Sequence, residues 1–331
     1  MSERHGEAGE RALGSLEALE AFDGSRRRRA LIIVNPYATA VSERLRDVVV
    51  SGLASRYAVE AVQTRARGHA TELAAAAAAS DCDVVVVYGG DGTVNEAANG
   101  LVGTSTPLTP LPGGSANVFC KLLAIPAEIV DATENLLTLA DSWQPRALDV
   151  GVVAGRSYTF SAGVGLDASV VRLVDAHPEL KRRFGPSFFL AGALWTLPRH
   201  YLRHPPRLRV TVDGATLDGI TAVVQNAAHY TYFNGKAIDL AAGATLDGGT
   251  LAGLVLRRGA LRDVPSLLAR SLGGAERVGA HRQVAPFATS GEVLIESADG
   301  RPLPLQLDGD YVTELLEARF TVRPGALSVI A

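Results

Sequence analysis

The chain has 331 residues, of which 47% are hydrophobic and 20% charged, and its formal net charge is −3 at pH 7. This composition is typical of a globular protein with about two domains of roughly 150 residues each, and it excludes a fully disordered chain, a collagen-like fibre and a coiled coil. The nearly balanced charge also argues against a protein built mainly to bind nucleic acid, because such proteins carry a basic domain.

The first 25 residues mix acids, arginines and small side chains, and we expect a mobile leader there. They lack the apolar core of a signal peptide, and no apolar run in the sequence reaches the ~18 residues that span a membrane. The two cysteines, Cys82 and Cys120, have neither the spacing of a metal site nor the number needed for a disulfide framework. A reducing, cytoplasmic location is therefore expected.

Strands and helices alternate from residue 30 to about residue 111. Apolar runs predict strands at 30–34, 58–63, 83–87 and 106–111, and helical spacing or alanine-rich composition predicts helices at 41–56, 70–80 and 93–101. Four consecutive valines at 84–87 are typical of a strand that is buried on both faces. The alternation predicts an α/β domain in which a parallel sheet lies between helices.

The pattern changes after residue 145. Strand-like segments occur at 147–153, 157–162, 208–212, 219–226, 250–256, 292–296 and 304–307, and helical segments at 168–176, 188–201 and 261–272. Turn-separated strands of this kind predict a second domain that is β-rich and mostly antiparallel.

The sharpest motif follows the third strand, which runs directly into Gly89-Gly90-Asp91-Gly92-Thr93 and then a helix. Glycines let backbone N–H groups approach an anion, and the start of a helix adds unpaired N–H groups and a positive dipole end. Asp91 is suited to bind a magnesium ion that bridges phosphates, and Thr93 to cap the helix or to donate to a phosphate. The alternative is a plain strand-to-helix turn with an aspartate cap.

Two other predicted strands end in comparable residues. Asn35-Pro36 ends the first strand, and Pro112-Gly113-Gly114-Ser115-Ala116-Asn117 ends the fourth. Because ligands bind at the carboxyl ends of the strands in open parallel sheets, these three segments are expected to surround a nucleotide.

Further motifs along the chain are Asn95-Glu96, Leu148-Asp149-Val150-Gly151 and Asp308-Gly309-Asp310. With this ordered set, the sequence resembles the diacylglycerol kinase catalytic domain family, which includes soluble bacterial lipid kinases and sphingosine kinases. The resemblance covers the chain from about residue 26 to the C-terminus. It implies a nucleotide-binding catalytic domain at 26–145, a β-rich lipid-substrate domain at 146–320, ATP in the cleft between them, and a segment at 321–331 that returns to the first domain.

The resemblance also implies a set of binding residues. Nucleotide contacts are expected at Asn35, Pro36, Tyr37, Ala38, Thr39, Thr64, Gly89, Gly90, Asp91, Gly92, Thr93, Val94, Asn95, Glu96, Ser115 and Asn117, and magnesium, bound with ATP, at Asp91 and Asp149. Some relatives hold a structural magnesium in a Leu-Asp-Asp-Gly turn. The corresponding turn here lacks the second carboxylate, which Gly248 replaces, so the metal site at Asp247 is incomplete. Ala40 and Val118 also stand where relatives often have a Lys and an Asp.

Phosphoryl transfer needs a base for the acceptor hydroxyl, and we assign this role to Asp310, with Asp308 orienting either the backbone or the water shell of the magnesium ion. Relatives more often have Glu in the place of Asp310, and the alternative is a surface Asp-Gly turn. The sequence has no Walker A lysine, because none of Lys121, Lys181 and Lys236 follows the required glycine loop. No arginine can be assigned to the phosphates from the sequence.

The resemblance implies an ATP-dependent lipid kinase that phosphorylates diacylglycerol or a related lipid, with a role in phospholipid metabolism. Two alternatives stay open. One is a catalytically impaired regulatory protein that binds a nucleotide or a lipid, and the other is a kinase of a soluble acceptor, since NAD kinases share a related Gly-Gly-Asp-Gly loop.

The partner is then a lipid acceptor at the membrane surface rather than a nucleic acid, and the protein is cytoplasmic and peripheral at the membrane. The apolar segment 188–197, which is followed by Arg199, Arg203 and Arg207, suits a membrane surface, or else it packs on the second sheet. Whether the chain forms a homo-oligomer stays open.

Overall fold

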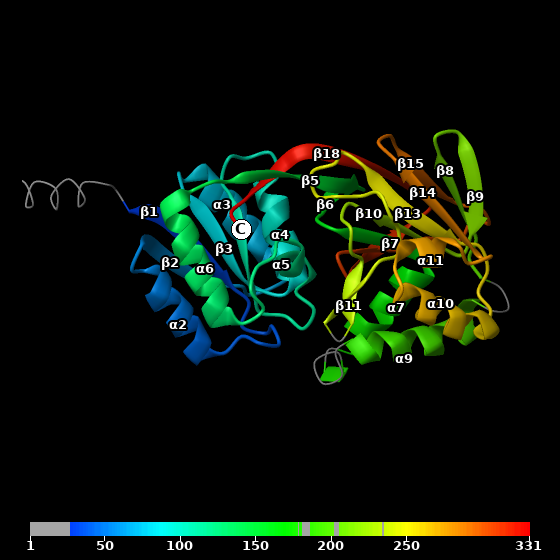
Figure 1. The fold of residues 1–331 in the computed structure, drawn as a ribbon, viewed down its shortest axis with the longest axis horizontal. Helices are drawn as coiled ribbons and strands as arrows, with labels where there is room; N and C mark the ends of the chain where they lie inside the picture. Colours follow the sequence, from blue (N-terminus) through cyan, green and yellow to red (C-terminus); the bar gives the residue numbers. More distant parts are fainter. Residues whose placement is uncertain (1–26, 178, 181–185, 202–204, 234) are drawn as a thin grey trace, which may run out of the picture.

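A computed structural model of the chain describes residues 27–331 except 178, 181–185, 202–204 and 234. The leader predicted at residues 1–25 lies outside the described residues. The described chain forms two halves, with helices packed around a mostly parallel sheet in the first and a larger share of strands in the second (Figure 1).

The first half is built on four strands in the order β2-β1-β3-β4, and each neighbouring pair is parallel. These strands are β1 (Arg28–Val34), β2 (Tyr57–Gln63), β3 (Val84–Gly89) and β4 (Leu108–Pro112), and the helices are α2 (Glu43–Leu53), α3 (His69–Ala79), α4 (Asp91–Leu101), α5 (Val118–Leu122) and α6 (Ile129–Ser142). All six residues of the central strand β3 are buried, as its run of valines predicts. The predicted parallel α/β sheet is confirmed.

Small side chains fix the position of α4 against α3. A Cβ at Gly100 of α4 would lie 2.4 Å from the carbonyl oxygen of Thr71 in α3, so the two helices approach each other more closely than an alanine would allow. Thr71 also donates a 2.7 Å hydrogen bond to the carbonyl oxygen of Glu96. These contacts hold the first turn of α4 directly after β3.

The second half contains a sheet of antiparallel strands in the order β14-β13-β10-β7-β16-β17. Its elements, with β18 last, are β5 (Arg146–Val153), β6 (Arg156–Tyr158), β7 (Ser161–Gly165), α7 (Leu166–Asp175), α9 (Pro186–Thr196), η1 (Leu197–Tyr201), β8 (Leu208–Val212), β9 (Ala215–Gly219), β10 (Thr221–Gln225), β11 (Thr231–Phe233), β12 (Lys236–Ile238), β13 (Leu251–Leu256), η2 (Leu261–Asp263), α10 (Val264–Ser271), α11 (Ala275–Gly279), β14 (Val284–Thr289), β15 (Val293–Ser297), β16 (Leu303–Leu307), β17 (Asp310–Leu315) and β18 (Glu317–Val329). The predicted antiparallel, β-rich second half is confirmed.

Two of the predicted elements are each divided in the structure. The strand expected at 157–162 is two strands, β6 and β7, because the backbone N–H groups of residues 159–161 donate to the carboxylate of Asp308 instead of continuing one ladder. The helix expected at 188–201 is α-helical only to Thr196 and continues as the π-helical turn η1. Pro198 lies in that turn, and a proline lacks the N–H group that an α-helix requires.

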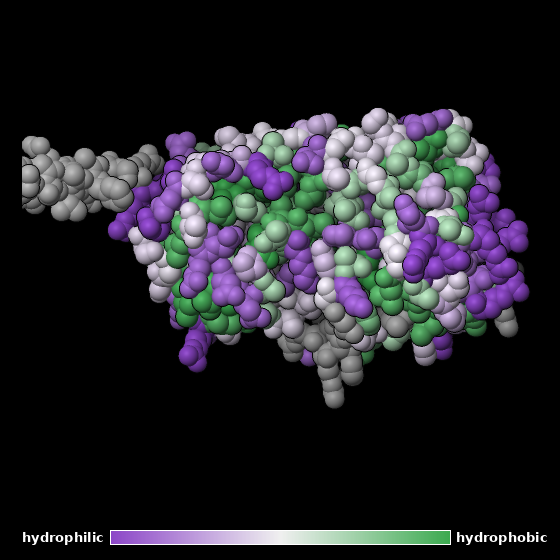
Figure 2. Space-filling model, viewed as in Figure 1, coloured by the Kyte–Doolittle hydropathy of each residue, from purple (hydrophilic) through white to green (hydrophobic). Residues whose placement is uncertain are grey.

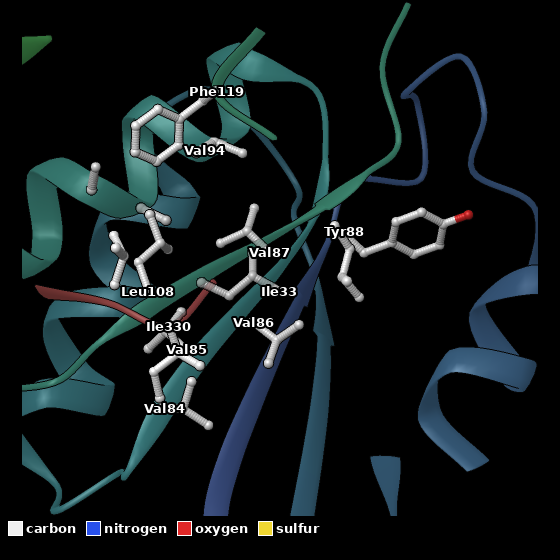
Figure 3. Packing of buried hydrophobic residues seen from close by; sticks show 14 of the residues in the cluster. Ile33, Val84, Val85, Val86, Val87, Tyr88, Val94, Leu108, Phe119 and Ile330 are labelled. Carbon is white, nitrogen blue, oxygen red and sulfur yellow. The ribbon is translucent and has the colours of Figure 1, made fainter. Parts of the chain in front are cut away.

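The last strand, β18, joins the two halves. It pairs antiparallel with β15 and β5 and ends parallel to β4, where Val329 is opposite Leu108. Ile330 is buried beside Val85 and Leu108 (Figure 3), and its carbonyl oxygen accepts a 2.9 Å hydrogen bond from Thr109. The C-terminal residues therefore complete the core of the first half.

Candidate active site

The glycine motif forms the turn between β3 and α4, and the third motif packs against it. A Cβ at Gly113 would lie 2.9 Å from the Cα of Gly89, and one at Gly114 would lie 2.7 Å from the Cα of Gly90. The two loops can lie back to back only without side chains. Gly90, the N-cap of α4, offers no side-chain cap, so no N-cap side chain occupies the first N–H groups of the helix, and such groups are suited to bind an anion.

Asn35 links the end of β1 to this turn. Its Nδ2 donates a 2.8 Å hydrogen bond to Oγ1 of Thr93, and its Oδ1 accepts a 3.0 Å hydrogen bond from the backbone N–H of Tyr37. Since β1 and β3 are parallel neighbours, their carboxyl ends meet at one edge of the sheet. The first two sequence motifs are therefore in direct contact.

A cavity of about 260 Å³ opens beside this contact. Predicted nucleotide residues from three separate segments line it, and Arg65, Ala66 and Arg67, which were not assigned from the sequence, complete the wall; the predicted residues are Asn35, Tyr37, Thr64, Thr93 and Glu96. The only sequence signal for the arginines is their position directly after Thr64. They supply cationic side chains to a cavity that no lysine lines among the described residues.

The third motif contributes a folded loop. Asn117 adopts a left-handed backbone conformation, with φ 48°, and its side chain bonds both the N–H and the carbonyl oxygen of Gly114. Ser115 is exposed at the tip of the same loop, and neither residue lines the cavity. Nucleotide contact by Ser115 and Asn117 stays a prediction, whereas the side chain of Asn117 visibly closes the loop.

Asp91 caps the short helix α5. Its Oδ1 accepts a 3.0 Å hydrogen bond from the backbone N–H of Phe119, and Val118 provides a second backbone donor. The pKa of Asp91 is raised to about 6, chiefly by burial. The carboxylates of Asp308 and Asp310 add to this shift, and the two backbone N–H groups oppose it. No local pattern in the sequence indicates that Asp91 caps α5.

Asp149 lies in β5 and is also engaged with backbone groups. Its Oδ2 accepts a 2.6 Å hydrogen bond from the N–H of Gly249, and its Oδ1 accepts a 2.8 Å hydrogen bond from the N–H of Gly325. It thus ties β5 to the turn that contains Asp247, which is exposed, and to β18. No group of three His, Cys, Asp or Glu side chains within the described residues is arranged to hold a metal ion.

These contacts do not fit a resident magnesium site shared by the predicted ligands Asp91 and Asp149, because both carboxylate oxygens of Asp149 and Oδ1 of Asp91 already accept backbone hydrogen bonds. The assignment stays a prediction that the geometry does not support.

Asp308 is fully enclosed where the two halves meet. Its Oδ2 accepts hydrogen bonds from Asn95 Nδ2 at 2.8 Å and from the N–H and hydroxyl of Thr159, and its Oδ1 accepts from the N–H groups of Phe160 and Ser161 at 3.0 Å each. Burial raises its pKa, and the backbone donors oppose that shift. With five donors around it, Asp308 is a positioning residue that ties the β16–β17 turn to α4.

Asp310 begins β17, two residues farther along. Its carboxylate lies against the first turn of α4: a Cβ at Gly92 would be 2.0 Å from Oδ2 of Asp310. The two predicted acidic residues therefore differ in role, since Asp308 holds the turn and Asp310 reaches the glycine motif. The fold brings this carboxylate from the second half to the glycine turn of the first.

Arg67 spans the same junction. Its Nη1 donates to the carbonyl oxygen of Tyr311 at 3.4 Å, and its Nη2 is 3.7 Å from Oδ2 of Asp175. That carboxylate oxygen also accepts the N–H of Tyr311 at 3.0 Å. An arginine of the cavity wall is thus in contact with the residue next to Asp310.

Two family models match the chain. The model described as the diacylglycerol kinase catalytic domain matches residues 29–153, and the model described as the YegS C-terminal NAD kinase beta sandwich-like domain matches residues 160–331. The chain belongs to the diacylglycerol kinase catalytic domain family. The resemblance inferred from the ordered motifs is confirmed.

Similar proteins cover most of the chain. The diacylglycerol kinase of Bacillus subtilis (strain 168) is 26% identical over 289 residues, which are 86% of this chain and 90% of that protein. The diacylglycerol kinase of Staphylococcus carnosus (strain TM300) is 24% identical over 300 residues, or 87% and 90% of the two chains. A crystal structure of a candidate diacylglycerol kinase from Bacillus anthracis str. Sterne has the same fold, with a TM-score of 0.71 at 22% identity and coverage of 92% of this chain and 98% of that one.

Two departures from the diacylglycerol kinase pattern can now be placed. Val118 is buried in the core at the start of α5, and its N–H is one of the donors to Asp91. Gly248 is exposed in the turn held by Asp149, so the missing carboxylate leaves no buried gap there. Neither departure disturbs the contact between Asp310 and Gly92.

Proposed function

We propose that this chain transfers the γ-phosphate of ATP to the hydroxyl group of a lipid, either diacylglycerol or a close relative of it. Membership of a family of lipid kinases supports phosphoryl transfer in general. The observation that carries the proposal is the contact between the Asp310 carboxylate and Gly92 in the first turn of α4. It brings a base to the turn that is suited to hold the phosphate that is transferred.

The first half supplies the groups that bind and orient ATP. The N–H groups at the start of α4 receive the phosphates, and the hydrogen bond between Asn35 and Thr93 fixes the turn. Arg65 and Arg67 line the adjoining cavity and offset phosphate charge in a protein without a Walker A lysine. ATP enters as its magnesium complex, and magnesium, when bound, neutralises part of the phosphate charge.

Asp310 accepts the proton of the acceptor hydroxyl while the hydroxyl oxygen forms a bond to the γ-phosphorus. The bond between that phosphorus and the β–γ bridging oxygen breaks, and ADP leaves with the electron pair. The products are the phosphorylated lipid and ADP, and the proton on Asp310 then passes to solvent. Asp308 keeps the turn in place through its five hydrogen bonds while this occurs.

A lipid acceptor lies in a membrane, so we propose that the protein works at the membrane surface as a cytoplasmic, peripheral enzyme. No helix in the part of the chain that the structure describes is long and apolar enough to cross a bilayer.

The test is ATP turnover with a panel of acceptors: diacylglycerol, monoacylglycerol and sphingosine in mixed micelles, and NAD and a sugar phosphate in solution. Turnover with a lipid alone is the expected result, and the lipid that turns over identifies the acceptor. Turnover only with NAD or the sugar phosphate would establish the soluble-acceptor alternative. ATP binding without turnover on any acceptor would establish a regulatory protein that has lost catalysis.

A further inference from the structure

Helix α10 has one apolar side packed on the protein, where Val264 and Leu267 contact buried clusters, and further leucines that the described chain leaves exposed. None of its residues is buried, although it carries two adjacent leucines. Leu268 is 40% exposed, and Leu272, directly after the helix, is 55% exposed. Large apolar side chains that lie exposed together on a surface mark sites of interaction with a partner outside the chain.

The end of α9 presents similar residues close to α10. Leu194 is 47% and Trp195 is 55% exposed, and Leu261 in η2 is 50% exposed. The next turn after α9 and the start of α10 meet at one buried cluster, which contains Leu197, Tyr201 and Ile220 and against which the partly buried Val264 packs. We call the five exposed residues around this cluster the apolar ridge: Leu194, Trp195, Leu261, Leu268 and Leu272.

Helices α9 and α10 lie on the same side of the second half (Figure 1). Figure 1 shows α9 and α10 along the same lower edge of the second half, and Figure 2 shows hydrophobic residues at the surface over α10, next to hydrophilic ones over α11. The apolar ridge therefore borders on charged residues rather than on a continuous apolar face.

The charge around the apolar ridge is strongly positive. The segment 257–282 holds six arginines and only two acids, in a chain whose net charge is −3. One of the two acids, Asp263, is buried and paired with Arg282 at 2.7 Å. On the α9 side, the guanidinium of Arg199 lies over the ring of Trp195. Exposed leucines and a tryptophan beside arginines are typical of helices that lie in the headgroup region of an anionic bilayer.

The apolar ridge is also connected to the candidate active site. Helix α9 packs on α7, and α7 packs on β16 and β17, the strand that begins with Asp310. One helical layer therefore separates the apolar ridge from the strand that carries the candidate base. A bilayer in contact with the ridge would lie close to the lipid-binding side of the reaction.

We propose that the apolar ridge and its arginines are the docking surface of this protein for an anionic lipid bilayer. The leucines and Trp195 enter the headgroup region, and the arginines around η2 and α10 contact lipid phosphates. This inference rests on the proposed function in one respect, namely that the acceptor lies in a bilayer. The surface itself follows from the exposure and charge of α9, η2 and α10.

The test uses the full chain and two kinds of vesicle, phosphatidylcholine alone and phosphatidylcholine mixed with phosphatidylglycerol. The wild type should sediment with the anionic vesicles, and Leu268→Glu/Leu272→Glu should weaken that binding by about tenfold or more, because two apolar contacts are replaced by like charges. Arg258→Ser/Arg262→Ser should remove the preference for anionic vesicles. Val48→Glu, at a similarly exposed apolar residue in α2 of the first half, is the matched control and should bind as the wild type does.

Folding is not at risk in the leucine variant, because α10 buries no residue, and circular dichroism with thermal melting verifies this point. Undiminished vesicle binding by Leu268→Glu/Leu272→Glu would overturn the proposal. So would a wild-type dimer that this variant dissociates, because the ridge would then be a contact between two copies of the chain.

Two acceptors separate docking from catalysis. With diacylglycerol in anionic vesicles, the leucine variant should lose turnover in step with binding, whereas with a short-chain diacylglycerol dissolved as monomer it should match the wild type. Equal losses on both acceptors would refute a docking role. Vesicle binding by a wild type that phosphorylates neither acceptor would leave the docking surface standing and remove the proposed kinase function.

Discussion

Replacing Gly92 by alanine should impair catalysis without harming the fold. The new Cβ would lie 2.0 Å from Oδ2 and 3.0 Å from Cγ of Asp310, so the carboxylate must move away by about 1 Å or more to reach an ordinary contact distance. A misplacement of that size in a reacting group costs about a hundredfold in rate. Gly92 lies in α4 without a positive φ, and alanine is favoured over glycine in a helix by up to about 1 kcal/mol, so stability should be equal or greater.

The assay for Gly92→Ala is kcat with a lipid acceptor, together with ATP affinity and the free energy of unfolding in urea. Gly52→Ala is the matched control, because that helical glycine in α2 has only an ordinary contact, 3.4 Å from a methyl group of Thr133, and its activity should not change. The double variant Gly92→Ala/Asp310→Asn should be no slower than Asp310→Asn alone. A wild-type kcat for Gly92→Ala, or fully additive losses in the double variant, would refute the role given to this contact.

Four other changes test the site. Asp310→Asn should lower kcat by roughly a hundred- to ten-thousand-fold with ATP binding retained, while Asp310→Glu keeps substantial activity; a fully active Asp310→Asn would remove the base assignment. Asp308→Asn should lower the free energy of unfolding in urea by about 2–3 kcal/mol, because the amide NH2 group cannot accept hydrogen bonds and leaves buried donors around it unpaired, and an unchanged midpoint would contradict its positioning role. The pKa of Asp91 is raised to about 6 in the folded state, so the folded protein holds a proton that the unfolded chain releases, and Asp91 lowers stability as pH rises from about 4 to 6. Above pH 6, Asp91→Asn should therefore be more stable than the wild type by up to about 3 kcal/mol. Parallel stability profiles of the two proteins against pH would argue against the raised pKa. Arg67→Ala should raise KM for ATP about tenfold if it offsets one phosphate charge, with exposed Arg44→Ala as the unaffected control, and equal KM values would exclude Arg67 from the phosphate site.

The α/β order of the first half could be predicted from the sequence because each element there carries a local signal. The valines of β3 indicate a strand that is buried on both faces, and the alanines of α3 indicate a helix that packs closely on its neighbours. Parallel strands that are joined by helices can be connected in only a few topologies. The meeting of Asn35 with Thr93 follows from the same rule, since both stand at the carboxyl edge of neighbouring strands. The sequence alone therefore determined the nucleotide side of the candidate site in outline.

The roles of the carboxylates were decided by tertiary contacts alone. Asp91, Asp149 and Asp308 are the same residue type in turns or strands of similar composition, yet their hydrogen-bond partners lie 28, 100 and 149 residues away in the chain. No local pattern states whether a carboxylate will meet backbone N–H groups or an open cavity, because that depends on which distant segment packs beside it. The same reason hid Arg67, whose contact with Tyr311 spans 244 residues. Likewise, the spacing of leucines in α10 predicts a helix with an apolar face, but only the packed structure decides that Leu267 meets a buried cluster while Leu268 stays exposed.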